Sequence, residues 1–184
     1  MKHWKRILSA LLIGAMALTL FAGCDKKVKV EDELFKQFSD YYQTLGRTLE
    51  QDPSNANAQK LLAYLQENCT STSLSSYLNT SANRTAIKTN VFPVPSGMRA
   101  EYLVGWADVV PEPTSEYYKD PTQFAHEILT RICFDPMPQN IKFSNGSTSD
   151  PLDKTASYSF AQGEIYGYQY YLVVIYRGPA VTTT

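Results

Sequence analysis

Histidine is the scarcest residue in this chain that could do acid–base or metal chemistry. Only His3 and His126 occur among the 184 residues, and there are three cysteines. Zinc sites usually need histidine as a ligand, and serine or cysteine nucleophiles usually need it as a base. The sequence also lacks a Gly-x-Ser-x-Gly elbow, a Cys-x-x-Cys pair and a glycine-rich phosphate loop. We therefore expect no metal site, no cofactor and no common nucleophilic triad.

The start of the chain has the layout of a leader. Residues 1–6 (MKHWKR) are basic, and residues 7–22 (ILSALLIGAMALTLFA) are uncharged and mostly apolar. This order is typical of a secretory signal peptide. As a helix, the apolar run would be about 24 Å long, which is shorter than the roughly 30 Å hydrocarbon core of a bilayer. We therefore predict a signal peptide over residues 1–23, and His3 would leave with it.

Cys24 follows the apolar run directly, after Leu20, Phe21, Ala22 and Gly23. This stretch resembles the lipobox of bacterial lipoproteins, although Phe21 stands where leucine is more usual. The resemblance implies that Cys24 is lipidated, with acyl chains such as palmitate, and becomes the mature N-terminus. The bilayer would then be a partner through acylated Cys24, because each buried CH₂ contributes about 0.8 kcal/mol. We expect a lipid-anchored protein of the bacterial cell membrane, with its domain on the extracytoplasmic side.

The charge of the mature chain excludes one class of partner. Residues 24–32 read as a lipidated, charged tether. When Lys2, Lys5 and Arg6 leave with the leader, 14 basic residues remain against 18 acidic ones, a net charge of about −4. Nucleic-acid-binding surfaces are strongly basic. We therefore expect no nucleic-acid partner.

Cys69 and Cys133 are the cysteines that remain after Cys24. Each ends a predicted helix, and an even number of cysteines in an exported domain suggests a disulfide. We expect a Cys69–Cys133 disulfide. Two buried thiols that never meet are the alternative.

Three segments have helical spacing, and two have strand composition. Apolar stripes with a period near 3.6 predict helices over residues 31–45, 55–68 and 120–132, the first ending at Gly46. Residues 99–106 and 156–176 are rich in aromatic and β-branched residues, and the second segment predicts a hairpin with its turn near Tyr166 and Gly167. The second arm of this hairpin is apolar without alternation, which indicates a central strand covered on both faces. The pattern predicts a single α+β domain over residues 33–178 and a tail over residues 179–184.

The hairpin also contains a cluster of tyrosines. Tyr166, Tyr168, Tyr170 and Tyr171 offer flat apolar faces with polar tips, which suit a carbohydrate or peptide groove. The outer edge of a sheet is the alternative explanation. Glu101, on the preceding strand, joins Tyr166, Tyr168 and Tyr170 as the candidate cleft.

The order of these elements resembles the CAP superfamily of cysteine-rich secretory and pathogenesis-related proteins. Residues 49–68 look like the second helix of that family, residues 100–111 like its central strand, residues 120–131 like its next helix and residues 158–176 like its closing hairpin. The resemblance implies an α-β-α sandwich. The family's cavity holds two histidines and two acidic residues, and here only Glu101 matches, so a family-type zinc or hydrolytic role is not implied. The alternative fold is cystatin-like or NTF2-like, with helices on one face of a curved antiparallel sheet.

Two functions follow from these observations. The first is a membrane-tethered, non-enzymatic binding or scaffold lipoprotein of the cell envelope, whose ligand is a protein, a peptide or a glycan. The second is an envelope hydrolase of CAP-like fold with an atypical active site. It would use Glu101 or His126 with a serine from residues 71–76. The two functions differ in one geometric requirement, because the hydrolase needs Glu101 and His126 in one cleft.

Overall fold

The computed structural model describes residues 29–94, 98–109, 120–134, 139–147 and 152–180. The predicted signal peptide, Cys24 and most of the predicted tether lie outside these ranges. Within them the chain has five helices and one five-stranded sheet, so the predicted α+β class is confirmed. No helix in the described ranges is both long and apolar enough to cross a membrane.

The sheet is mixed and open, with the strand order β1-β4-β5-β2-β3. Its strands are β1 (Thr48–Gln51), β2 (Ala100–Asp108), β3 (Asn140–Asn145), β4 (Thr155–Ile165) and β5 (Tyr168–Arg177). Strand β1 runs parallel to β4, and the other neighbouring pairs are antiparallel. The predicted hairpin is therefore present as β4 and β5, and it occupies the middle of the sheet.

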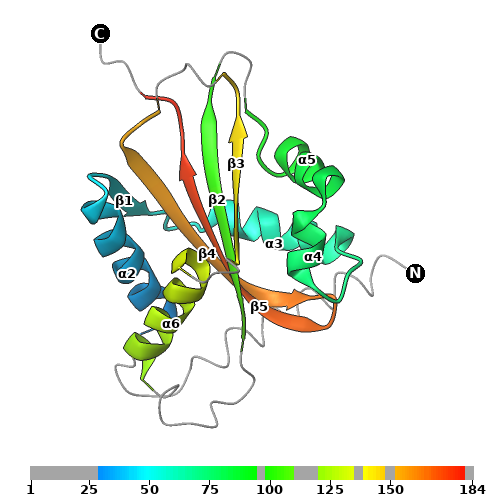
Figure 1. The fold of residues 1–184 in the computed structure, drawn as a ribbon, viewed down its shortest axis with the longest axis horizontal. Helices are drawn as coiled ribbons and strands as arrows, with labels where there is room; N and C mark the ends of the chain where they lie inside the picture. Colours follow the sequence, from blue (N-terminus) through cyan, green and yellow to red (C-terminus); the bar gives the residue numbers. More distant parts are fainter. Residues whose placement is uncertain (1–28, 95–97, 110–119, 135–138, 148–151, 181–184) are drawn as a thin grey trace.

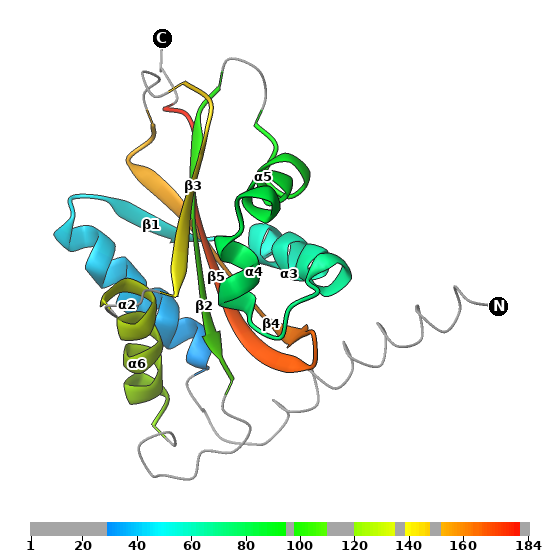
Figure 2. The ribbon, with the colours of Figure 1, turned by 45° about the vertical axis from the view of Figure 1, so that its right-hand side comes forward.

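Helices cover both faces of this sheet (Figures 1 and 2). On one face lie α2 (Val30–Thr44) and α6 (Pro121–Phe134), and on the other lie α3 (Ala56–Asn68), α4 (Leu74–Asn79) and α5 (Ser81–Asn90). The arrangement is an α-β-α sandwich, as predicted. It does not agree with the cystatin-like or NTF2-like alternative, in which helices cover one face only.

The central strand β5 supplies side chains to two separate cores. Leu172 and Val174 pack in the core beneath α3, α4 and α5, whereas Val173 and Ile175 pack in the core beneath α2 and α6. Successive side chains of a strand point to opposite faces, so a strand buried on both faces needs apolar residues at every position. This requirement explains the unbroken apolar run in the second arm of the hairpin.

Polar side chains and positive φ angles mark the ends of several elements. The Asp120 carboxylate accepts a hydrogen bond from the Thr122 N–H at 2.9 Å at the start of α6, and this stabilises free N–H groups of the first turn. Tyr166 and Gly167 join β4 to β5 with φ angles of 50° and 85°. Two successive positive φ angles are the signature of a type I′ hairpin turn.

The domain is slightly longer than the sequence predicted. Helix α2 begins at Val30, so the last residues of the predicted tether are helical. Pro179, the first residue of the predicted tail, forms a bridge with Leu152. Helices α4 and α5 and strands β1 and β3 were not predicted, because they are short and rich in polar residues.

Candidate functional site

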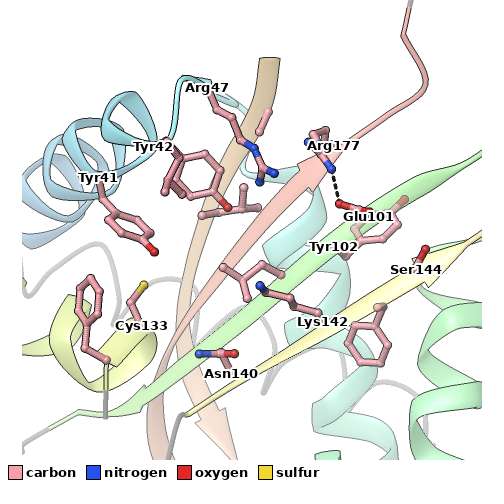
Figure 3. Close-up of a pocket in the computed structure, with 16 residues that line it drawn as sticks. Tyr41, Tyr42, Arg47, Glu101, Tyr102, Cys133, Asn140, Lys142, Ser144 and Arg177 are labelled. Carbon is pink, nitrogen blue, oxygen red and sulfur yellow. Dashed lines mark hydrogen bonds and ion pairs between the residues drawn. The ribbon is translucent and has the colours of Figure 1, made fainter. Parts of the chain in front are cut away.

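A cavity of about 600 Å³ opens on the face of the sheet that carries α2 and α6. It lies where these two helices end, between their C-terminal turns and strands β2, β3 and β5 (Figure 3). Figure 1 shows that β2, β3 and β5 continue past both helices. The cavity therefore exists because this end of the sheet is longer than the helices that cover this face.

The end of α2 places an arginine at the cavity. Gly46 has a φ of 67°, its N–H donates to the Gln43 carbonyl at 2.9 Å, and the Arg47 N–H donates to the Tyr42 carbonyl at 3.0 Å. This pair of bonds is a Schellman motif, which needs a residue in the left-handed region at the position of Gly46. The predicted stop at Gly46 is thus confirmed. The motif turns the chain so that Arg47 lines the cavity together with Tyr41 and Tyr42 of the last helical turn.

The strands place two more cations and one acid at the cavity. Glu101 on β2 pairs with Arg177 on β5, and Leu103 on β2 pairs with Lys142 on β3. Residues two apart on a strand share a face. Glu101, Leu103, Lys142 and Arg177 therefore lie on the α2–α6 face together.

Glu101 has both carboxylate oxygens occupied. Arg99 donates to Oε1 at 2.6 Å and Arg177 donates to Oε2 at 2.5 Å, and the three side chains are half-buried or more. Charge-assisted hydrogen bonds of this kind are about twice as strong as neutral ones. Glu101 is thus held between two arginines.

Arg47 and Lys142 differ from Arg177 because neither has an acidic partner among the residues that the structure describes. Within the described part of the chain, neither side chain makes a hydrogen bond or an ion pair. Figure 3 shows both side chains directed into the space between α2, β2 and β3. These two cations are available to a bound molecule.

Two ionisable groups of the cavity stay neutral across the ordinary pH range. Burial raises the pKa of the Tyr42 hydroxyl to about 12, despite the nearby charge of Arg47, which lowers it. Burial also raises the pKa of the Cys133 thiol to about 11, and the Lys142 ammonium opposes this increase. Neither group adds a negative charge, so the three cations exceed the single acid in the described lining.

The structure separates the residues of the predicted cleft. Glu101 lines the cavity, and it pairs with Arg177 at one end of β5. Tyr166 and Tyr168 lie at the opposite end, at the hairpin tip, where they are 52% and 53% exposed. Tyr170 is buried on the other face of the sheet. The four side chains do not form one cleft, because strand direction and alternation separate them.

Cys69 and Cys133 are both free thiols in the structure, so the predicted disulfide is not present. Cys69 follows α3 and packs in the core of one face, whereas Cys133 belongs to α6 on the other face. A disulfide needs Cα atoms within about 7 Å of each other. The sheet lies between these two cysteines and prevents that approach.

The residues of the hydrolase alternative lie at three different places. Glu101 lines the cavity, but His126 does not, and its Nδ1 lies 3.3 Å from Oε1 of Gln37 on the α2–α6 surface. Residues 71–76 precede or belong to α4, on the opposite face of the sheet. The described part of the chain also holds no group of three or more histidine, cysteine or acidic side chains that could bind a metal ion.

Sequence reasoning missed Arg47, Lys142 and Arg177. One usable signal was present for Arg47, because it directly follows the predicted stop of a helix. Lys142 and Arg177 carry no comparable signal, because their approach depends on the order of strands β3, β2 and β5.

Comparison of the chain with protein-family models, with curated proteins and with solved structures finds no match. The resemblances to lipoproteins and to the CAP superfamily therefore stay predictions from the sequence.

Proposed function

We propose that this chain is a lipid-anchored binding protein of the bacterial cell envelope. Acylated Cys24 would hold it at the membrane, on the extracytoplasmic side, and the domain from Val30 onward would bind an envelope component. That component is a protein, a peptide or a glycan. The anchor is supported by the apolar run of residues 7–22 and by the small residues Ala22 and Gly23 before the cysteine.

One observation carries the binding role: a cavity of about 600 Å³ into which Arg47 and Lys142 point without a hydrogen-bond or ion-pair partner among the described residues. Ligand sites are usually concave, with apolar walls and a few polar groups that converge. The hydrolase alternative receives less support, since Glu101, His126 and the serines of residues 71–76 lie apart. We therefore favour binding over catalysis.

The anchor is tested by replacing its cysteine. Cells that express Cys24→Ala should take up no labelled fatty acid into this protein and should accumulate the uncleaved precursor. Cys133→Ala, which removes a different thiol, should be labelled and cleaved normally. Labelling of Cys24→Ala at the native level would show that the anchor is elsewhere.

The binding site is tested by filling the cavity. Native mass spectrometry of the protein released from its own envelope should show an adduct, and this adduct should disappear in Leu103→Trp and in Ser144→Trp. Leu103 is half-buried in the floor and Ser144 is exposed at the rim, so the two variants fill the cavity with different risks to folding. Gln59→Trp places the same bulk on exposed α3 and should keep the adduct. An adduct that survives in a folded Ser144→Trp would exclude this cavity as the site.

A further inference from the structure

The charge in the cavity is opposite in sign to that of the whole chain. The formal net charge of the chain is −1, whereas the described lining contains Arg47, Lys142 and Arg177 against one acid, Glu101. Both oxygens of Glu101 already accept hydrogen bonds from arginines. Its negative charge is therefore largely compensated, and the cavity presents a local positive potential.

The free polar groups of the cavity are mostly donors. Arg47 and Lys142 can only donate, since neither has an acceptor atom. The hydroxyls of Tyr41 and Tyr42 make no hydrogen bond within the described residues, and the raised pKa of Tyr42 keeps its proton in place. A ligand that accepts hydrogen bonds from these donors must have many acceptor atoms, as an anionic group does.

The strand register places two of the cations on either side of β2. Lys142 pairs with Leu103 from β3, and Arg177 pairs with Glu101 from β5. Standard strand spacing puts their Cα atoms roughly 10 to 12 Å apart. Long side chains from these positions can converge on one group above β2, and Arg47 approaches the same space from the end of α2 (Figure 3).

Beside the cations lies an apolar rim. Among the exposed large apolar residues of the described chain, Leu45 (50% exposed) and Phe134 (57% exposed) both line this cavity. Tyr41 packs edge-on against Phe134, with ring centroids 5.3 Å apart. Exposed apolar side chains that gather at a concave site are stabilised when a ligand covers them.

We propose that the cavity binds an amphiphilic anion, with a carboxylate or phosphate group between Arg47, Lys142 and Arg177 and an apolar body against Tyr41, Leu45 and Phe134. This inference rests on the proposed binding function and names the chemistry of its ligand. Carboxylates and phosphates offer the same acceptor oxygens to arginine and lysine. Probes that carry either a carboxylate or a phosphate distinguish the two groups.

The test compares charged and neutral probes of one shape. The acylated protein in nanodiscs of zwitterionic lipid is titrated calorimetrically with 2-naphthoate, 2-naphthyl phosphate and neutral 2-naphthamide. At least one anion should bind about tenfold more tightly than the amide, and more weakly as salt increases. The tighter anion identifies the group. Failure of both anions to bind, or equal binding of the amide, would overturn the proposal.

A second test uses variants that remove either a positive or a negative charge from the cavity. Arg47→Met and Lys142→Met should each weaken anion binding about five- to tenfold, since each removes a charge-assisted contact. Glu101→Gln removes the one acid of the described lining and should tighten binding. Lys60→Met removes an exposed cation from α3, on the other face, and should change nothing. An equal loss in Lys60→Met would show that the anions respond only to net charge, and the proposal would fall.

The outcomes also separate this inference from the function on which it rests. If Ser144→Trp removes the envelope adduct while the amide binds as well as the anions, the cavity is the binding site and only the anionic ligand is wrong. If Ser144→Trp changes neither the adduct nor the binding of any probe, both proposals fail.

Discussion

At the scale of single residues, burial changes the acid–base behaviour of the tyrosines. Tyr42 lies at the cavity and Tyr102 in the opposite core, and burial raises the pKa of each hydroxyl from 10.0 to about 12. Burial raises the pKa of Tyr158 as well, and the nearby carboxylates of Glu31 and Asp32 add to this effect. The folded state therefore holds these protons more tightly than the unfolded chain does.

This difference predicts a loss of stability at alkaline pH. The unfolded chain loses the Tyr42 proton near pH 10, whereas the folded chain keeps it up to about pH 12. The Tyr42 proton contributes fully to the free energy of unfolding below pH 10. This contribution is lost as the pH increases from about 10 to 12, because the unfolded state then binds fewer protons than the folded state. Tyr42→Phe should reduce the loss between pH 9.5 and 11.5 by roughly 2 kcal/mol, measured by urea unfolding. Tyr166→Phe, at an exposed position, should follow the unaltered protein. If the free energy of unfolding fell equally with pH in Tyr42→Phe and in the unaltered protein, the raised pKa of Tyr42 would be wrong.

At the scale of elements, two helices pack directly on glycines of the sheet. A Cβ atom at Gly105 of β2 would lie 2.6 Å from Cγ2 of Ile132 on α6, and one at Gly163 of β4 would lie 2.8 Å from Cδ2 of Leu62 on α3. These distances are shorter than van der Waals contact, so each glycine lets a helix approach the sheet closely.

This packing predicts the effect of adding one methyl group. Gly105→Ala should destabilise the protein by about 1 to 3 kcal/mol, because the new methyl group overpacks against Ile132. Without the clash, alanine in a strand would instead stabilise by roughly 0.5 to 1 kcal/mol. Denaturant unfolding of Gly105→Ala, Ile132→Ala and the double variant completes a cycle. The free energy of unfolding of the double variant should fall by less than the sum of the decreases in the two single variants. Additive losses would show that the two residues do not meet.

At the scale of the whole molecule, the sheet divides the chain into two cores that do not mix. Cys69 lies in one core and Cys133 beside the other. Each layer of an α-β-α sandwich is about 10 Å from the next, which is too far for a disulfide across the sheet. The state of the two thiols therefore tests whether α3 and α6 lie on opposite faces of the sheet.

The layer order predicts two free thiols. Full-length Cys24→Ala, unfolded without reductant in the presence of an alkylating reagent, should gain two labels, at Cys69 and Cys133. Prior reduction should not change the mass. A protein that takes up label only after reduction would contain the disulfide, and the placement of α3 and α6 on opposite faces would be wrong.

Helical periodicity in the sequence was sufficient to predict α2, α3 and α6, and aromatic and β-branched composition was sufficient to predict β2 and the β4–β5 hairpin. These elements bury a regular stripe or an unbroken apolar run, and their burial follows directly from residue type. Elements α4, α5, β1 and β3 are short and polar, so their formation depends on neighbours distant in the sequence rather than on a local pattern.

The α+β class, the central position of β5 and the end of α2 at Gly46 follow from the sequence, because each depends on local pattern or backbone conformation. The contacts between polar residues depend instead on how the strands and helices pack. Glu101, Lys142 and Arg177 come from three different strands, and Arg47 comes from the connection between α2 and β1. Strand order and register bring them together, whereas they place Tyr166, Tyr168 and Tyr170 away from Glu101. Such contacts are set by the pairing of distant strands, which no spacing along the chain encodes.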